Sequence, residues 1–248
     1  MNVRGKVYLI GAGPGDPDLL TVKAQRILRS AKVVLYDRLV SPEVLLTASP
    51  EAELVYVGKH EGEQEQTQQV IFDLMLERAL QGQTVVRLKG GDPCVFGRAG
   101  EEWLMLVRSS VEVEVIPGVS SALAAPLLAG VPLTFRGLSR GFAVVTGHCA
   151  GGGVCWQNYA AVDTLVILMG VQNRREIARD LIRAGRPTDE PVVFVERSTT
   201  PEERVVDTTL GEVARGSVEV ESPAVFIVGA VAGLRAELHA RAAEEVEA

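Results

Sequence analysis

The chain has few cysteines and few aromatic residues for its length. Three of its 248 residues are cysteine and 5% are aromatic. Cys94, Cys149 and Cys155 form no CxxC pair, so the sequence predicts no disulfide framework, as in proteins of a reducing compartment. We expect these thiols to be small buried side chains and no metal to be bound. A metal site made of His148, Cys149 and Cys155 is the alternative, although its spacing matches no common zinc pattern.

Long apolar runs and an excess of positive charge are also absent. No apolar run approaches the roughly 18 to 20 residues that span a bilayer, and the chain begins without a signal-peptide core. We therefore expect a cytoplasmic protein with no membrane partner. The net charge of -7 at pH 7 argues against a nucleic-acid partner, because phosphate contacts need a basic surface. An acidic small-molecule substrate is compatible with this charge, because a cleft can be locally basic.

Short β-branched runs alternate with amphipathic segments in the first half of the chain, which predicts an α/β fold. The predicted strands are Val7–Ile10, Val33–Tyr36, Leu54–Val57, Val85–Leu88 and Val113–Ile116. The predicted helices are Thr21–Ser30, Gln68–Leu80 and Gly100–Ser109. Ile71, Leu74, Met75 and Ala79 recur at helical spacing, so we expect them on a helix face that packs against the sheet.

The composition changes at Ile116-Pro117-Gly118, where small residues follow and predict a hinge. We expect an N-terminal α/β domain over 1–117 and a C-terminal α/β domain over 118–248. Further strands are predicted at Ala143–Thr146, Thr164–Met169, Val192–Glu196, Val205–Thr208 and Ala224–Val228. Several of these lie too close together for a helix between them, so the second sheet should be mixed.

A glycine-rich loop, Gly11 to Pro17, follows the first predicted strand, where an open α/β sheet binds ligands. Asp37, after the second predicted strand, raises the alternative of a nicotinamide dinucleotide. Asp16 replaces the third glycine of that fingerprint and would repel a pyrophosphate, while Pro14 and Pro17 remove N–H donors. S-adenosylmethionine, which has no phosphate, suits this loop better; a purely structural turn is the other alternative.

Further motifs follow the same predicted strands. They are Tyr36–Val40, Val57–Lys59, Arg87–Pro93 and Val95–Glu102. Shorter ones continue to the end: Pro117–Ser121, Pro132–Thr134, Arg136–Gly137, Thr146–His148, Met169–Gly170, Glu196 and Ser222–Ala224. Together with Gly11–Thr21, these motifs resemble the tetrapyrrole methylase family, in order and at family spacing, over nearly the whole chain.

The resemblance implies a homodimer whose active site lies in the cleft between a parallel-sheet N-terminal domain and a mixed-sheet C-terminal domain. It implies that S-adenosylmethionine methylates uroporphyrinogen III at carbons C2 and C7. The products would be precorrin-2, a precursor of siroheme or cobalamin, and S-adenosylhomocysteine. The implied cofactor contacts are Pro14, Gly90, Gly91, Asp92, Val95, Ser120, Ser121, Met169, Ser198 and Ala224. Met169 also fits an ordinary core residue at a strand end.

Methylation of a pyrrole carbon leaves a cation that must lose a proton, which a carboxylate can accept. By the resemblance, Asp37 is this proton acceptor and Lys59 a proton donor. Asp37 also fits an ion pair with a nearby arginine, and Lys59 a solvated surface charge. Because the substrate carries carboxylates, arginines near the motifs are substrate-binding candidates. They are Arg38, Arg98, Arg136 and Arg140.

Three other functions are alternatives to this one. A methylase of a later corrin precursor is the nearest, and Asp37–Leu39 with Phe96–Arg98 favour the earlier substrate. A nicotinamide-dependent oxidoreductase rests only on the glycine loop and Asp37. A non-catalytic interaction module explains none of the motif order.

Overall fold

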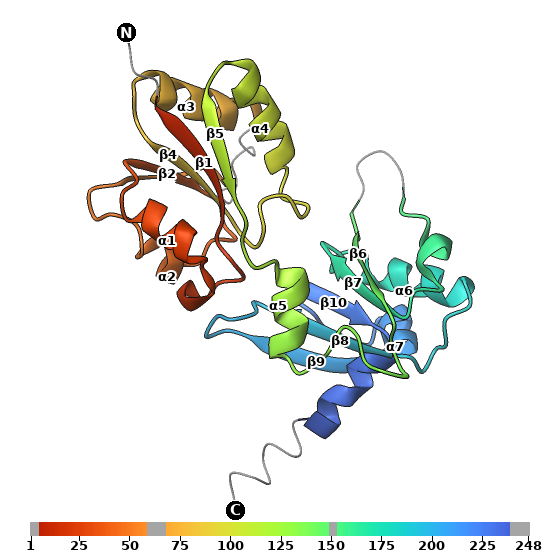
Figure 1. Cartoon of the computed structure of the whole chain (residues 1–248). Coiled ribbons are helices and arrows are strands. Elements are labelled where there is room, and N and C mark those ends of the chain that lie inside the picture. Colours follow the sequence, from red (N-terminus) through yellow and green to blue (C-terminus); the bar gives the residue numbers. More distant parts are fainter. Residues whose placement is uncertain (1–4, 59–67, 149–152, 239–248) are drawn as a thin grey trace, which may run out of the picture. The chain divides into compact units, whose positions relative to one another are not determined.

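The structure is a computed structural model that describes residues 5–58, 68–148 and 153–238. The chain folds as two compact units, an N-terminal unit, Met1–Ser121, and a C-terminal unit, Ala122–Ala248 (Figure 1). The boundary that the sequence predicts, after Pro117, lies in the segment between β5 and α5, whereas the two units divide at the first residue of α5. No helix in the described ranges is long and apolar enough to cross a membrane.

Five parallel strands form the sheet of the N-terminal unit. They are β1 (Lys6–Gly11), β2 (Val33–Tyr36), β3 (Glu53–Tyr56), β4 (Val85–Lys89) and β5 (Glu112–Ile116). Their order is β3-β2-β4-β1-β5, which puts β4 at the centre. The connecting elements are η1 (Pro17–Leu19), α1 (Val22–Leu28), α2 (Pro42–Leu45), α3 (Gln68–Leu80) and α4 (Ala99–Arg108). The predicted parallel α/β sheet is confirmed.

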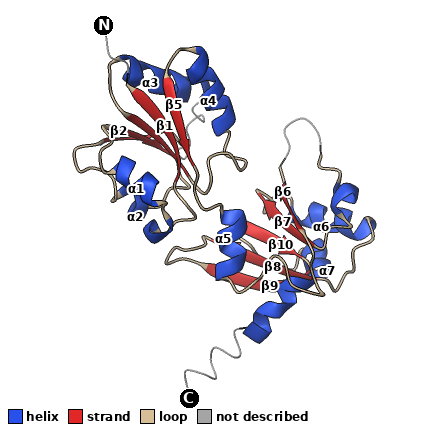
Figure 2. Ribbon diagram, viewed as in Figure 1, coloured by secondary structure: helices blue, strands red, loops and turns tan. Residues whose placement is uncertain are grey.

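Alternation along the strands gives this sheet a hydrophobic core on each face. Val85 and other side chains of one face pack with α3 and α4, and Val86 and Leu88 of the other face pack with α1 and α2. Figure 2 shows these two pairs of helices on opposite faces of the sheet. Ile71, Met75 and Ala79 are buried against the sheet. The predicted packing face of α3 is thereby confirmed.

The sheet of the C-terminal unit is mixed, as predicted. Its strands are β6 (Phe142–Thr146), β7 (Thr164–Leu168), β8 (Pro191–Glu196), β9 (Arg204–Thr209) and β10 (Ala224–Val228). In the order β6-β7-β10-β8-β9, β6 and β7 are parallel and the other neighbours are antiparallel. The other elements are α5 (Ser121–Leu128), η2 (Trp156–Tyr159), α6 (Arg174–Arg183), α7 (Leu210–Arg215) and η3 (Ala230–Gly233).

This second sheet also has two cores. One face packs with α6 and α7 around the stacked rings of Phe194 and Phe226, whose centroids lie 4.4 Å apart. The other face packs with α5 and η3. Each unit thus has the layered arrangement that buries both faces of a central sheet.

The expectation of buried cysteines is wrong for both cysteines that the structure describes. Cys94 and Cys155 are exposed. Cys94 lies in the loop after β4, where its N–H donates to Asp92 (2.9 Å), and Cys155 directly precedes η2. Both therefore lie outside the strands and helices that form the cores. Cys149 lies outside the described residues, so the alternative metal site is not tested. Within the described residues, no group of three or more His, Cys, Asp or Glu could hold a metal ion.

Candidate functional site

The candidate site begins where the loops after β1, β4 and β5 meet, at the carboxyl edge of the N-terminal sheet. Ligands of open parallel sheets bind outside this edge. The Ala12 N–H donates to the Lys89 carbonyl (2.7 Å). Gly13 and Gly91 exchange two backbone hydrogen bonds, of 3.2 and 2.7 Å. The glycine loop is therefore joined directly to the loop after β4.

Close backbone approach explains the glycines at this edge. A Cβ on Gly118 would lie 2.3 Å from the Gly91 oxygen, and one on Gly11 would lie 2.5 Å from the Gly118 nitrogen. Asp92 then fixes the junction, since its carboxylate accepts hydrogen bonds from the N–H groups of Gly118 (3.2 Å) and Cys94 (2.9 Å). Gly11 and Gly118 were not among the predicted site residues, although both stand inside the predicted motifs.

The predicted cofactor residues of the N-terminal unit lie in these three loops, apart from Ser121, which begins α5. The loop residues are Pro14, Gly90, Gly91, Asp92, Val95 and Ser120. Gly91 has φ +67°, and a Cβ built there would lie 3.5 Å from the Ser121 nitrogen. Val95 is exposed in the loop that follows Asp92. The edge thus presents backbone groups, small side chains and hydroxyls, which suit a neutral adenosine and a zwitterionic amino acid.

The first loop offers less to a pyrophosphate. Asp16 caps η1, because its carboxylate accepts the Asp18 N–H at 2.8 Å, and Pro17 stands at the first turn without an N–H. The place where a dinucleotide would meet helix N–H donors is therefore taken by a carboxylate. This geometry favours S-adenosylmethionine over a nicotinamide dinucleotide.

Three predicted cofactor residues belong to the C-terminal unit: Met169, Ser198 and Ala224. Met169 follows β7 with φ 56° and is 50% exposed, so the alternative of an ordinary core residue is wrong. Ser198 is buried, and its hydroxyl has no hydrogen-bond partner among the described residues. Its neighbours Arg197 and Thr199 have φ 43° and 65°, and non-glycine residues in this region cluster at functional sites.

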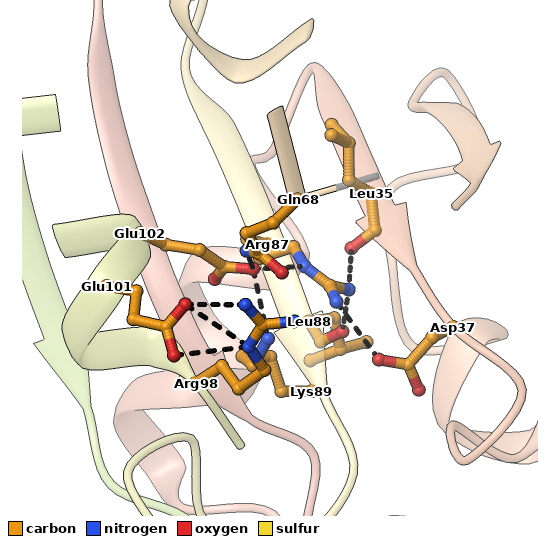
Figure 3. Close-up of polar contacts among 9 residues, drawn as sticks. All are labelled: Leu35, Asp37, Gln68, Arg87, Leu88, Lys89, Arg98, Glu101 and Glu102. Carbon is orange, nitrogen blue, oxygen red and sulfur yellow. Dashed lines mark hydrogen bonds and ion pairs between the residues drawn. The ribbon is translucent and has the colours of Figure 1, made fainter. Parts of the chain in front are cut away.

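Asp37 lies directly after β2 and is held at both carboxylate oxygens. Its Oδ2 accepts a hydrogen bond from Nη2 of Arg87 at 3.1 Å (Figure 3). Its Oδ1 accepts the Leu39 N–H at 3.1 Å. The side chain is 24% exposed. Asp37 thus forms the ion pair that the sequence offers as its alternative, and its role as proton acceptor stays a prediction.

Behind Asp37 lies a group of buried charges that the sequence analysis missed. The Oε1 of Glu102 accepts hydrogen bonds from Gln68 Nε2 (2.7 Å), Lys89 Nζ (3.1 Å) and Arg87 Nε (3.5 Å). The side chains of Glu102, Arg87 and Lys89 are 0%, 4% and 7% exposed. Burial, together with the charge of Arg87, lowers the pKa of Lys89. The available signal was a pair of cations two residues apart, Arg87 inside a predicted strand and Lys89 directly after it.

The remaining predicted residues are exposed or outside the described ranges. Lys59 is outside them. Arg98 forms an ion pair with Glu101 at 2.6 Å, and the Arg140 side chain, 92% exposed, lies 3.7 Å from Asp163. Arg38 and Arg136 are also exposed. Arg38 and Arg98 belong to the N-terminal unit, and Arg136 and Arg140 to the C-terminal unit.

Known proteins share this sequence and fold. Residues 6–214 match the family model of the tetrapyrrole (corrin/porphyrin) methylases. The uroporphyrinogen-III C-methyltransferase of Synechococcus elongatus is 44% identical over 232 residues, which cover 93% of this chain and 95% of that protein.

Two solved structures are similar as well. The uroporphyrin-III C-methyl transferase of Thermus thermophilus, complexed with S-adenosyl homocysteine, is 54% identical with a TM-score of 0.82, covering 92% of this chain and 93% of that one. A cobalt precorrin-4 methyltransferase of cobalamin biosynthesis is 31% identical with a TM-score of 0.81, covering 92% and 95%. The family model and these relatives match most of the chain, including the glycine loop after β1 and Asp37. The chain therefore belongs to the tetrapyrrole methylase family.

Proposed function

We propose that this chain uses S-adenosylmethionine to methylate uroporphyrinogen III at C2 and C7, giving precorrin-2. The observation that carries the proposal is the edge of the N-terminal sheet where backbone hydrogen bonds join the loops after β1 and β4. The carboxylate of Asp37, held by Arg87, follows β2, which is the neighbour of β4 in the sheet. The higher identity to enzymes named for uroporphyrin III supports the early substrate.

S-adenosylmethionine supplies an electrophilic methyl group, which the electron-rich carbon of a reduced pyrrole attacks. The loops after β1, β4 and β5 hold the reactants in line and keep water away from them. Asp37 accepts the proton that the methylated ring loses. Its two oxygens are fixed by Arg87 and by the Leu39 N–H, and the further lone pairs of a carboxylate can take the proton.

The other site residues have separate proposed roles. Gly91 and Asp92, with the other predicted residues of the same loops, hold the cofactor through backbone and small polar groups, and the buried hydroxyl of Ser198 gains its missing partner there. Lys59 donates a proton to the substrate. The predicted arginines bind substrate carboxylates through their guanidinium forks; they are Arg38, Arg98, Arg136 and Arg140.

The proposal extends to the cellular setting. We infer a cytoplasmic homodimer that binds no nucleic acid, in line with the family resemblance and the charge of -7. Trp103, Leu104 and Val107 on α4 are exposed. They form apolar surface that two associating chains could bury.

A second candidate is a methylase of a later corrin precursor, which the similar fold of the cobalt precorrin-4 methyltransferase supports. The two differ in substrate and share the cofactor. A direct comparison of uroporphyrinogen III with a later precorrin as methyl acceptor separates them.

The test is the rate of S-adenosylhomocysteine formation, measured anaerobically with uroporphyrinogen III, in the wild type and in Asp37→Asn. We expect substrate-dependent formation in the wild type. Without its proton acceptor, Asp37→Asn should be slower by roughly 10²- to 10⁴-fold, while calorimetry shows unchanged S-adenosylhomocysteine affinity. A wild type that forms none with this substrate contradicts the proposed function, and an equally fast Asp37→Asn contradicts the role of Asp37.

A further inference from the structure

Four ionisable side chains form a connected group beneath the candidate site. Arg87 and Lys89 come from the central strand β4, Glu102 from α4, and Asp37 follows β2 (Figure 3). Taking charges out of water is costly, and a buried ion pair is often no more stable than packed apolar side chains. Fold stability alone is therefore a weak reason for such a group in the middle of a sheet.

The backbone register explains how Arg87 reaches Asp37. Arg87 pairs with Leu35 of β2, so Asp37 lies two positions further along the neighbouring strand. Nη1 of Arg87 donates to the carbonyls of Leu88 (2.9 Å) and Leu35 (3.5 Å), and Nη2 donates to Asp37 (3.1 Å). Nε faces Glu102 at 3.5 Å. Every nitrogen of the guanidinium thus has a partner, which fixes its plane and the Asp37 oxygen that it contacts.

Glu102 neutralises the inner side of the group. One of its oxygens accepts hydrogen bonds from both cations and from Gln68, whereas the other, Oε2, is buried without a partner in the described part of the chain. If Glu102 were absent, Arg87 and Lys89 would be two buried cations on one strand, and Asp37 would be the remaining ion-pair partner of Arg87 among the described residues. Glu102 therefore holds Arg87 in place without competing for Asp37.

We propose that Arg87 is a positioning residue for Asp37 in the methyl-transfer reaction, and that Glu102 keeps Arg87 in that orientation. The inference rests on the proposed function, in which Asp37 accepts a proton. A proton acceptor must point at the carbon that loses the proton, and a misplacement of about 1 Å can cost on the order of 10²-fold in rate. Arg87 supplies this alignment from the interior of the sheet, without contacting the substrate.

A double-mutant cycle in kcat tests the proposal. The variants are Arg87→Gln, Asp37→Asn and the combination of both, assayed with uroporphyrinogen III. We expect Arg87→Gln to lower kcat by roughly 10- to 100-fold, with KM for S-adenosylmethionine within about twofold of the wild type. Since Arg87 acts through Asp37, adding Arg87→Gln to Asp37→Asn should lower kcat no further.

Matched variants separate positioning from folding. Arg186 is also buried, at 5% side-chain exposure, and binds Glu190 through two hydrogen bonds of 2.7 and 2.6 Å in the C-terminal unit. Arg186→Gln should lower the unfolding temperature and leave kcat unchanged. Arg87→Lys retains the positive charge but loses the planar guanidinium group that contacts Asp37, Glu102 and the Leu88 carbonyl. Its kcat should therefore lie between those of the wild type and Arg87→Gln. If Arg87→Gln does not fold, Arg87→Lys replaces it in the cycle.

Two results overturn the proposal, and they differ in what else they contradict. Losses in Arg87→Gln and Asp37→Asn that multiply in the double variant show that Arg87 does not act through Asp37, and leave the proposed function standing. Absence of any methylated product with the wild type overturns the proposed function and the positioning role together.

Discussion

Ser198 buries a hydroxyl that finds no partner among the described residues. If this hydroxyl binds the cofactor, Ser198→Ala should weaken S-adenosylhomocysteine binding by roughly two- to tenfold, the value of one hydrogen bond. The free energy of unfolding should stay within about 0.5 kcal/mol of the wild type, because the folded chain loses no hydrogen bond. Calorimetric titration and urea unfolding measure the two quantities.

Ser139 provides the matched control for Ser198. Its hydroxyl is buried, donates to the Leu133 carbonyl (3.0 Å) and lies 2.9 Å from the Thr164 hydroxyl. Ser139→Ala should lower the free energy of unfolding by about 1–2 kcal/mol and leave cofactor affinity unchanged. The reverse pattern, with affinity lost in Ser139→Ala and kept in Ser198→Ala, would remove Ser198 from the site.

Gly118 shows how little room the joined loops leave. Gly118→Ala would place a Cβ 2.3 Å from the Gly91 carbonyl oxygen, so the backbone must move at a cost of about 1–3 kcal/mol. We expect this loss in urea unfolding, together with weaker S-adenosylhomocysteine binding. Gly141→Ala, whose Cβ meets nothing within 4 Å, should change neither quantity. Wild-type behaviour of Gly118→Ala would contradict the close packing of this edge.

At the scale of elements, ion pairs of Glu114 connect the strands β5 and β1 and the helix α1. This residue of β5 forms ion pairs with Lys6 of β1, at 2.7 Å, and with Lys23 of α1. The hydrogen bonds of Lys23 and Lys6 lower the pKa of Glu114 to about 2, from 4.5. Because the folded-state pKa is lowered, the stabilisation is complete above about pH 4.5 and is lost as the pH falls toward 2.

Urea unfolding at several pH values measures the free energy of unfolding of Glu114→Gln and of the wild type. At neutral pH the variant should be less stable than the wild type, and the difference should shrink between pH 4.5 and 2. Glu51→Gln removes a more exposed pair, with Lys32 at 3.6 Å, and should have little effect at any pH. A Glu114→Gln difference that does not depend on pH would show that this ion pair does not contribute.

The five strands and the helices α1, α3 and α4 of the N-terminal unit were predicted, because β-branched runs bounded by turn residues and periodic apolar positions mark them, whereas the short α2 was not. Helix α6 was missed, since charged and polar side chains cover most of it and few positions, among them Ile177 and Leu181, are buried. The burial of Arg87 and Lys89 was not predictable either. A charged side chain in a strand is usually exposed, and the contacts of these two, with Glu102 of α4 and with Asp37 after β2, come from segments distant in the sequence.

For the whole molecule, the alternating β-branched and amphipathic segments predicted the α/β class, and the order and spacing of the motifs predicted the family. Most residues that the sequence predicts as cofactor contacts in the N-terminal unit lie in the loops that the structure joins. The exposure of Cys94 and Met169 could not be predicted, since it depends on loop conformations that no periodicity encodes. The most informative test is one that needs both units of the chain.

That test is the mass of the tetrapyrrole formed anaerobically from uroporphyrinogen III and S-adenosylmethionine with a deuterated methyl group. We expect a product that carries two labelled methyl groups, with a singly labelled species appearing earlier in the time course. A product that stops at one label would contradict methylation at both carbons. An unlabelled tetrapyrrole, under conditions where calorimetry shows cofactor binding, would contradict the substrate itself and point to a later corrin precursor.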